Sequence, residues 1–189
     1  MVYYIGGASC AGKTTIAKII AEKHNMNYFS ADQSLAASLK SNKNKETIKY
    51  LTKSNNLVSL HPSKQADLMI SVYHEIFDSI MSIIIQQLQS LNTDIIAEGT
   101  VFLPELMKNK NNYIILIPTE NFLRKILPER NYVKRESNNN PYLIDNILQR
   151  TIHISEYISG NAQNNNIPIF QNDNNLDNTL LFAEKTFNL

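Results

Sequence analysis

Eight consecutive residues near the start of the chain have the types and spacing that bind a nucleoside triphosphate. They fit the pattern G-x-x-x-x-G-K-[ST] at every fixed position. Glycines let the backbone turn closely around phosphate groups, so that successive N–H groups point at phosphate oxygens. In this pattern the lysine reaches the β- and γ-phosphates, and the threonine hydroxyl ligates Mg²⁺. The stretch therefore predicts a phosphate-binding loop (P-loop, or Walker A motif) for ATP, whose binding residues are Gly7, Ala8, Ser9, Cys10, Ala11, Gly12, Lys13, Thr14 and the following Thr15.

The residues on either side of this loop agree with that interpretation. Val2–Ile5 is a β-branched and aromatic run typical of a buried strand. Residues 15–24 carry apolar side chains at helical spacing, and the helix that they predict would add its N-terminal dipole to the anion site. The alternative is a glycine turn that happens to precede a helix with an early lysine. The strand and the helix together favour a P-loop.

Two carboxylates follow further predicted strands. Asp32 comes after the strand at 26–30, and Glu98 closes the strand at 94–98. An acid at the carboxyl end of a parallel strand can orient or deprotonate an acceptor hydroxyl, or hold Mg²⁺. Glu98 stands where a Walker B acid would hold the metal, although Asp is commoner there. Asp32 has a structural alternative, as the cap of a helix at 33–39, and Glu98 has another, as a surface strand end. Gly99 favours function for Glu98, because glycine permits close approach of a ligand or of the P-loop backbone.

Basic residues gather after the fourth predicted strand, at 113–117. A helix at about 119–127 is followed by a Pro- and Asn-rich segment, 128–141, with little apolar content. We interpret this segment as a mobile lid that closes over ATP and delivers guanidinium groups to the transferring phosphoryl group. Arg130 and Arg135 are the first candidates, and Arg124 is assigned to nucleotide binding. An ordinary solvated loop is the alternative.

The remaining segments complete an alternating α/β pattern. A polar stretch at 41–56, with five lysines in or beside it, is either a substrate flap or a solvated face. A long helix is expected from Pro62 to Leu91, and another at 142–158 that Gly160 and an Asn run would end. A fifth strand at 167–170 precedes a polar loop that could border the adenine, and a last helix begins near Leu176.

Composition limits the class of protein. The chain has 189 residues and 43% hydrophobic content, which predicts one domain with a substantial core, and no apolar run approaches membrane-spanning length. Met1 leads directly into the first strand, so we expect no signal peptide. Eighteen basic against seventeen acidic residues leave no overall basic field for nucleic acid. The four histidines lack metal-ligand spacing. We therefore expect a cytoplasmic monomer or homodimer without nucleic-acid or membrane partners.

The single cysteine excludes an internal disulfide framework and fits a reducing compartment. This residue, Cys10, lies inside the P-loop, where it is a candidate for oxidation or alkylation. A small residue that fits the loop is the simpler explanation, and we favour it.

In this order of elements the chain resembles, over its whole length, the small P-loop kinases of the nucleoside-monophosphate-kinase and shikimate-kinase type. The resemblance implies a three-layer α/β P-loop NTPase fold, with a five-stranded parallel sheet in the order 2-3-1-4-5. It also implies one domain, 1–189, with a substrate-binding insertion at 33–91 and a lid at 128–141. The opening Gly-Gly-Ala-Ser-x-x-Gly-Lys-Thr-Thr at residues 6–15 and the pair Glu98-Gly99 look most like the metabolite-kinase branch, which includes 2-phosphoglycerate-kinase-like proteins.

The resemblance also implies roles. It makes ATP and Mg²⁺ the cofactors, Thr14 and Glu98 the metal ligands, and a small molecule with a hydroxyl group the phosphoryl acceptor. Catalytic roles fall to Lys13, Asp32, Glu98, Arg130 and Arg135. The insertion contains no arginine, which argues against a nucleoside monophosphate and leaves lysines or a neutral acceptor. A nucleoside or nucleotide kinase, or a regulatory ATP-binding module without acceptor turnover, remains the alternative. A GTPase is not favoured, because the guanine-reading motif N-K-x-D is missing.

Overall fold

A computed structural model describes residues 1–34, 60–138 and 140–189, except for the side chain of Arg135. Its centre is a five-stranded parallel sheet in the order β2-β3-β1-β4-β5, which confirms the expected 2-3-1-4-5 topology. The predicted substrate flap, 41–56, lies outside the described residues, as does most of the insertion between 33 and 59. The strands are β1 (Val2–Gly7), β2 (Asn27–Ser30), β3 (Ile95–Glu98), β4 (Tyr113–Pro118) and β5 (Ile169–Asn172).

Alternating side chains on the central strands bury both faces of the sheet. Tyr4 in β1 and Ile115 in β4 belong to one buried cluster, whereas Ile5 and Ile114 belong to the other. Because the side chains of a strand point alternately to its two faces, a strand that is apolar throughout needs helices on both sides. The chain supplies them, so the molecule has three layers.

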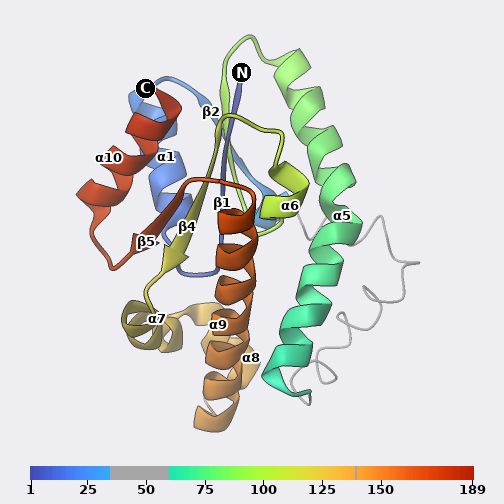
Figure 1. Cartoon of the computed structure of the whole chain (residues 1–189), viewed down its shortest axis with the longest axis vertical. Helices are drawn as coiled ribbons and strands as arrows, with labels where there is room; N and C mark the ends of the chain where they lie inside the picture. The colour runs from blue at the N-terminus through green and yellow to red at the C-terminus, as the bar shows by residue number, and fades with distance from the viewer. Residues whose placement is uncertain (35–59, 139) are drawn as a thin grey trace.

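Two helices cover one face of the sheet: α1 (Lys13–Lys23) and α10 (Leu176–Phe187). The other face is covered by α5 (Pro62–Ser90), α6 (Pro104–Met107) and α9 (Pro141–Asn164), with α5 and α9 packed side by side. The segment after β4 forms α7 (Glu120–Ile126), a 3₁₀ turn (Leu127–Glu129) and α8 (Asn131–Ser137), which lie at the lower end of the molecule in Figure 1.

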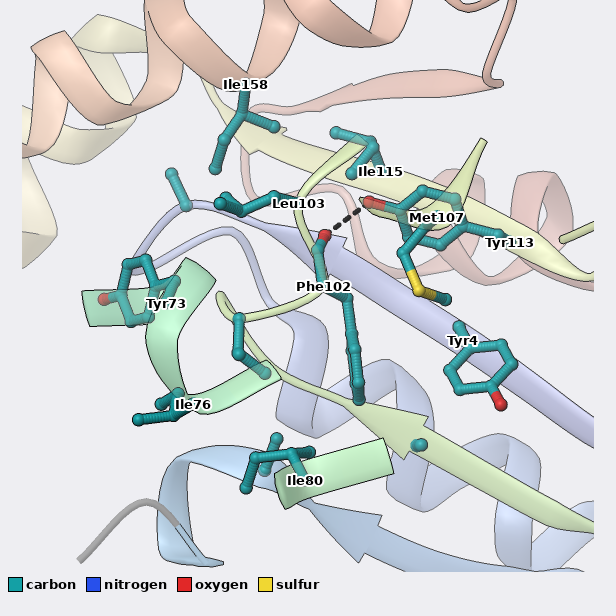
Figure 2. Packing of buried hydrophobic residues seen from close by; sticks show 14 of the residues in the cluster. Tyr4, Tyr73, Ile76, Ile80, Phe102, Leu103, Met107, Tyr113, Ile115 and Ile158 are labelled. Atoms are coloured by element: carbon teal, nitrogen blue, oxygen red, sulfur yellow. Dashed lines mark hydrogen bonds between the residues drawn. The ribbon is translucent and has the colours of Figure 1, made fainter. Parts of the chain in front are cut away.

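The core under α5 also fixes the loop that follows β3. Ile76 and Ile80 of α5 are fully buried, and the ring of Phe102 packs edge-on against Tyr4 with centroids 5.4 Å apart. The Tyr113 hydroxyl donates a hydrogen bond to the main-chain carbonyl of Phe102 (Figure 2). These contacts hold the residues just after β3 against the sheet, close to the end of the P-loop strand.

By length and composition alone, α5 could cross a membrane. This differs from the expectation that no apolar run approaches membrane-spanning length. The inner face of the helix supplies isoleucines to the core, and 28% of its 18-residue apolar window is buried. Its outer face carries exposed polar side chains at helical spacing, namely Lys64, Asp67, Ser71, His74, Asp78 and Ser82.

The helix after the lid does not end where the sequence suggested. Gly160 lies inside α9, which continues to Asn164. A glycine inside a helix costs about 1 kcal/mol relative to alanine. Ala162, one half-turn further on, is fully buried in the core, and continuing the helix is what places it there. The fifth strand is likewise displaced by two residues, since its ladder with β4 pairs Ile115 with Ile169 and runs to Asn172.

An ion-pair cluster joins the two helices of the α1/α10 layer. Glu184 of α10 accepts hydrogen bonds from Lys23 at 2.9 Å and from the ring of His24 at 3.0 Å. The hydrogen bond from Lys23, followed by that from His24, lowers the pKa of Glu184 below its ordinary value. A carboxylate with a lowered pKa stabilises the folded state above its unfolded pKa of about 4.3, and that contribution disappears as the pH falls through the folded pKa.

We therefore predict that Glu184→Gln lowers the free energy of unfolding by about 0.5–1 kcal/mol at pH 7. The difference from wild type should shrink as the pH falls through the lowered pKa of the folded state, and vanish once the wild-type carboxyl group is also neutral there. Urea unfolding at a series of pH values measures this. Glu22→Gln, a change at an exposed residue of α1, is the control. A difference that is constant with pH would contradict the proposed role of the carboxylate charge.

Candidate active site

The P-loop joins β1 to α1 through two residues in the left-handed region. Cys10 has φ 63° and Gly12 has φ 86°. A left-handed residue followed directly by a right-handed helix is the backbone pattern of an anion-binding nest. Glycine is required at position 12 on two grounds: its positive φ, and the side-chain nitrogen of Asn172, which would lie 2.7 Å from an added Cβ.

Lys13 is a buried cation. Its side chain is 6% exposed, and its ammonium donates to the Ala8 carbonyl at 2.8 Å and to the Thr100 hydroxyl at 3.4 Å. Within the described part of the chain, no carboxylate forms an ion pair with it. Burying a charge among neutral oxygens alone is costly. The position therefore favours an anionic ligand such as a phosphate.

One cavity of about 330 Å³ brings the predicted parts together. It is bordered by the P-loop, by the acid after β2 and by the start of the lid. Gly7 and Ala8 do not border it: Gly7 ends β1, and Ala8 contributes the carbonyl that holds Lys13. The lining residues are Ser9, Cys10, Ala11, Gly12, Lys13, Thr14, Thr15, Asp32, Arg130 and Tyr132.

Glu98 ends β3 with its carboxylate 1% exposed. Its Oε1 accepts hydrogen bonds from the Tyr28 hydroxyl at 2.9 Å and from the Ser30 hydroxyl at 2.7 Å. Its Oε2 is buried and has no hydrogen-bond partner among the described residues. A carboxylate oriented at one oxygen and open at the other fits a ligand such as Mg²⁺ or a water bound to it.

The hydroxyl groups beside Glu98 are missed by the sequence analysis. Ser30 pairs in register with Glu98 across the β2–β3 ladder, and Tyr28 lies two residues earlier on the same face. Burial raises the pKa of Tyr28 to about 12; hydrogen bonds from Ser30 and Thr14 oppose this rise, and the Glu98 charge adds to it. Tyr28 therefore remains a neutral donor at physiological pH. The sequence did contain a signal for this role, because Tyr28 and Ser30 carry hydroxyl groups at alternate positions of a short strand and therefore point to the same face.

Asp32 lies within a helical turn that begins at Ala31, so it does not cap a helix from outside. Its Oδ1 instead accepts a hydrogen bond from the main-chain N–H of Thr100 at 3.3 Å. Gly99 explains how the two segments come together: an added Cβ would lie 2.6 Å from the Cβ of Ala31 and 3.4 Å from Asp32 Oδ1. The sequence predicted that a ligand or the P-loop backbone would approach Gly99. In the structure the close approach is made instead by the helical turn that follows β2.

The three predicted lid arginines lie in different places. Arg130 is exposed and borders the cavity. Arg124 lies on the surface of α7, where its guanidinium donates to Glu120 at 2.8 Å and 2.7 Å, and it is not among the lining residues. The side chain of Arg135 lies outside the described part of the structure.

The lid itself contains regular structure, where the sequence predicted a mobile segment with little apolar content. Val133 of α8 is fully buried in a cluster that also includes Leu123, Leu127, Ile147 and Leu148. Cys10 of the P-loop packs against the same cluster. Cys10 thus contacts the lid side of the site and also lines the cavity.

A buried arginine on α9 is a further feature that the sequence analysis did not assign. Arg150 is 5% exposed, and its guanidinium donates to Glu136 of α8 at 2.8 Å and to Gln65 of α5 at 3.2 Å. It therefore ties the lid helix to the two helices beside it. Its position could have been noticed, because it shares a helix face with the apolar residues Ile147 and Ile154.

Tyr73 is buried on α5. Burial, and then the nearby charge of Asp32, raise its pKa well above its ordinary value, while Arg150 and a hydrogen bond from Thr100 oppose this rise. Its hydroxyl thus lies close to the segment that carries Thr100 and Asp32.

Comparison with protein-family models and with curated proteins finds no match for this chain. Among solved structures, shikimate kinase from Bacteroides thetaiotaomicron matches with a TM-score of 0.56 and 17% identity, covering 100% of this chain and 99% of that one. The chain has the three-layer P-loop NTPase fold. An uncharacterized protein from Eubacterium ventriosum ATCC 27560 matches with a TM-score of 0.48 and 14% identity, covering 100% and 98% of the two chains. At these identities the similarity establishes the fold alone.

In a P-loop fold the orientation of Glu98 leads to a prediction about metal dependence. We expect Glu98→Gln to remove most of the increase in ATP affinity that Mg²⁺ causes, because the amide cannot supply the second anionic oxygen. Tyr28→Phe should reduce the same increase by about tenfold or more, since it releases the carboxylate. Calorimetric titration of ATP with and without Mg²⁺ measures both effects.

The control for this experiment is Glu105→Gln. Glu105 of α6 also accepts hydrogen bonds through Oε1, from Tyr157 and His74, and also has a buried Oε2 without a partner among the described residues. Neither carboxylate is among the residues that line the cavity, but Glu98 pairs with Ile5 of the strand that leads into the P-loop, whereas Glu105 lies in α6. An equal loss of Mg²⁺ dependence in the control, or none in Glu98→Gln, would contradict the assignment.

Proposed function

We propose that this protein is an ATP- and Mg²⁺-dependent phosphotransferase that moves the γ-phosphoryl group of ATP to a hydroxyl of a small metabolite. The observation that carries the proposal is the shared cavity. Its lining includes Lys13, which is buried and has no carboxylate partner in the described part of the chain, together with Asp32 and Arg130. A site that only stored nucleotide would need the first of these groups, whereas phosphoryl transfer uses all three.

In this proposal the P-loop binds the triphosphate and Lys13 contacts its β- and γ-phosphates. Thr14 and Glu98 would hold the metal, because a hydroxyl and a carboxylate are oxygen ligands of the kind that Mg²⁺ prefers. Glu98 has one buried oxygen that no described residue hydrogen-bonds. When bound, Mg²⁺ would neutralise charge on the phosphates. Tyr28 and Ser30 keep the Glu98 carboxylate in place.

The acceptor hydroxyl is assigned to Asp32. The carboxylate is exposed at the cavity and oriented by the Thr100 N–H, so it can orient the hydroxyl or accept its proton. Arg130, with Arg135 as a second candidate, would stabilise the negative charge of the group being transferred. Arg124 is less favoured, because Glu120 already pairs with it.

The class of acceptor is narrowed by Arg150. Its guanidinium is paired with Glu136 inside the protein, and no arginine occurs at 33–91. We therefore favour a neutral hydroxyl metabolite, or one whose anionic group is held by lysines, over a nucleoside monophosphate, whose phosphate needs an available arginine clamp.

The test is ADP release from ATP and Mg²⁺ with pooled hydroxyl metabolites, nucleosides and nucleotides. We expect turnover that depends on one pool and falls by at least about a hundredfold in Lys13→Ala, which loses the buried ammonium. Lys185→Ala on α10, an exposed lysine away from the cavity, should leave turnover unchanged. Tight ATP binding without turnover in any pool would contradict the proposal and favour a regulatory nucleotide-binding module.

A further inference from the structure

Asn172, the last residue of β5, contacts two loops at once. Its side chain is buried, and the residue is 7% exposed. The amide nitrogen donates to the Ala11 carbonyl of the P-loop at 2.9 Å, and the amide oxygen accepts from the N–H of Asn174 at 2.9 Å. Both ends of a buried amide are thus used, each on a different loop.

The contact with the P-loop lies where that loop is most constrained. Ala11 directly precedes Gly12, whose Cα faces the Asn172 amide so closely that an added Cβ would lie 2.7 Å from the nitrogen. Gly12 is in turn the left-handed residue from which α1 begins. A side chain that fixes the Ala11 carbonyl therefore fixes the peptide at the entrance to α1, where phosphates would bind.

The second contact is with the loop that leads to α10. In this loop Asn174 is left-handed, with φ 80°, and Asn175 caps α10 by accepting a hydrogen bond from Asn178 at 3.0 Å. The three residues after Asn172 are exposed. The sequence analysis gives this loop as one that could border the adenine of a bound nucleotide. Asn172 is therefore the side chain that connects the phosphate end of the site with the candidate base end.

We propose that Asn172 is a positioning residue that sets the P-loop and the β5–α10 loop in one arrangement, so that the phosphates and the base of a nucleotide bind together. It acts through the Ala11 carbonyl and the Asn174 N–H, and touches no reacting atom. The inference rests on the proposed function only in requiring that the site bind ATP.

Asn172→Asp tests the hydrogen bond to the Ala11 carbonyl, because aspartate has nearly the same shape as asparagine but loses the amide donor. The carboxylate can still accept from Asn174, but it places an anionic oxygen against the Ala11 carbonyl and near the phosphates. We expect ATP affinity at pH 7.5 to fall by about tenfold or more. Burial raises the pKa of such a carboxyl, so lowering the pH to 5.5 should protonate it, restore a donor and recover part of the affinity.

Asn161→Asp is the matched control. Asn161 also donates its amide to a main-chain carbonyl, that of Tyr157 at 3.0 Å, but on α9. This variant should bind ATP like wild type at both pH values. Thermal unfolding of each variant separates loss of binding from loss of folding, and Asn172→Ala replaces Asn172→Asp if the latter does not fold.

Coupling between the two loops is tested with two probes, ATP and inorganic tripolyphosphate. Asn172→Ala should weaken ATP binding more than tripolyphosphate binding, because only ATP uses the base end. Equal losses for both probes, or a folded Asn172→Asp variant with wild-type affinity and no pH dependence, would overturn the inference. If the wild-type protein binds neither probe, both the proposed function and this inference are refuted. If the wild type binds ATP and the Asn172 variants fail in either way described above, only the inference is refuted.

Discussion

A buried ammonium group without a carboxylate partner is the constraint on which this site depends. Among the residues that the structure describes, Lys13 is held by the Ala8 carbonyl and the Thr100 hydroxyl, and no carboxylate pairs with it. A buried ammonium group is stabilised when an anion lies next to it. The backbone of the P-loop around Lys13 has the conformation of an anion-binding site. The left-handed residues of the P-loop, the start of α1 and the Asn172 amide all fix the peptides around this one position.

The parallel sheet brings the other groups to the same place. The carboxyl ends of β1, β2 and β3 lie together, so that the P-loop, Asp32 and Glu98 become neighbours although they are far apart in the chain. Close packing then sets their geometry. Gly99 lets the end of β2 approach the segment after β3, and hydroxyl groups on β2 orient the Glu98 carboxylate.

The sequence was sufficient for the fold and for the groups that a linear motif identifies. Lys13 and Thr14 follow from the P-loop spacing, and Asp32 and Glu98 from their positions after apolar strands. Tyr28, Ser30 and Asn172 were not predicted to have a role, because their partners are set by strand register and by loops distant in sequence. The extent of α9 was also missed, since burial of Ala162 outweighs the local tendency of Gly160 to end a helix.

A crystal structure with Mg²⁺ and a non-hydrolysable ATP analogue tests the central claim most directly. We expect the γ-phosphate within hydrogen-bond distance of the Lys13 ammonium, the metal beside Thr14 and Glu98, and Arg130 directed toward the transferring group. An analogue bound elsewhere, with the Lys13 ammonium still satisfied only by Ala8 and Thr100, would contradict the claim that this cavity is built around the transfer of a phosphoryl group.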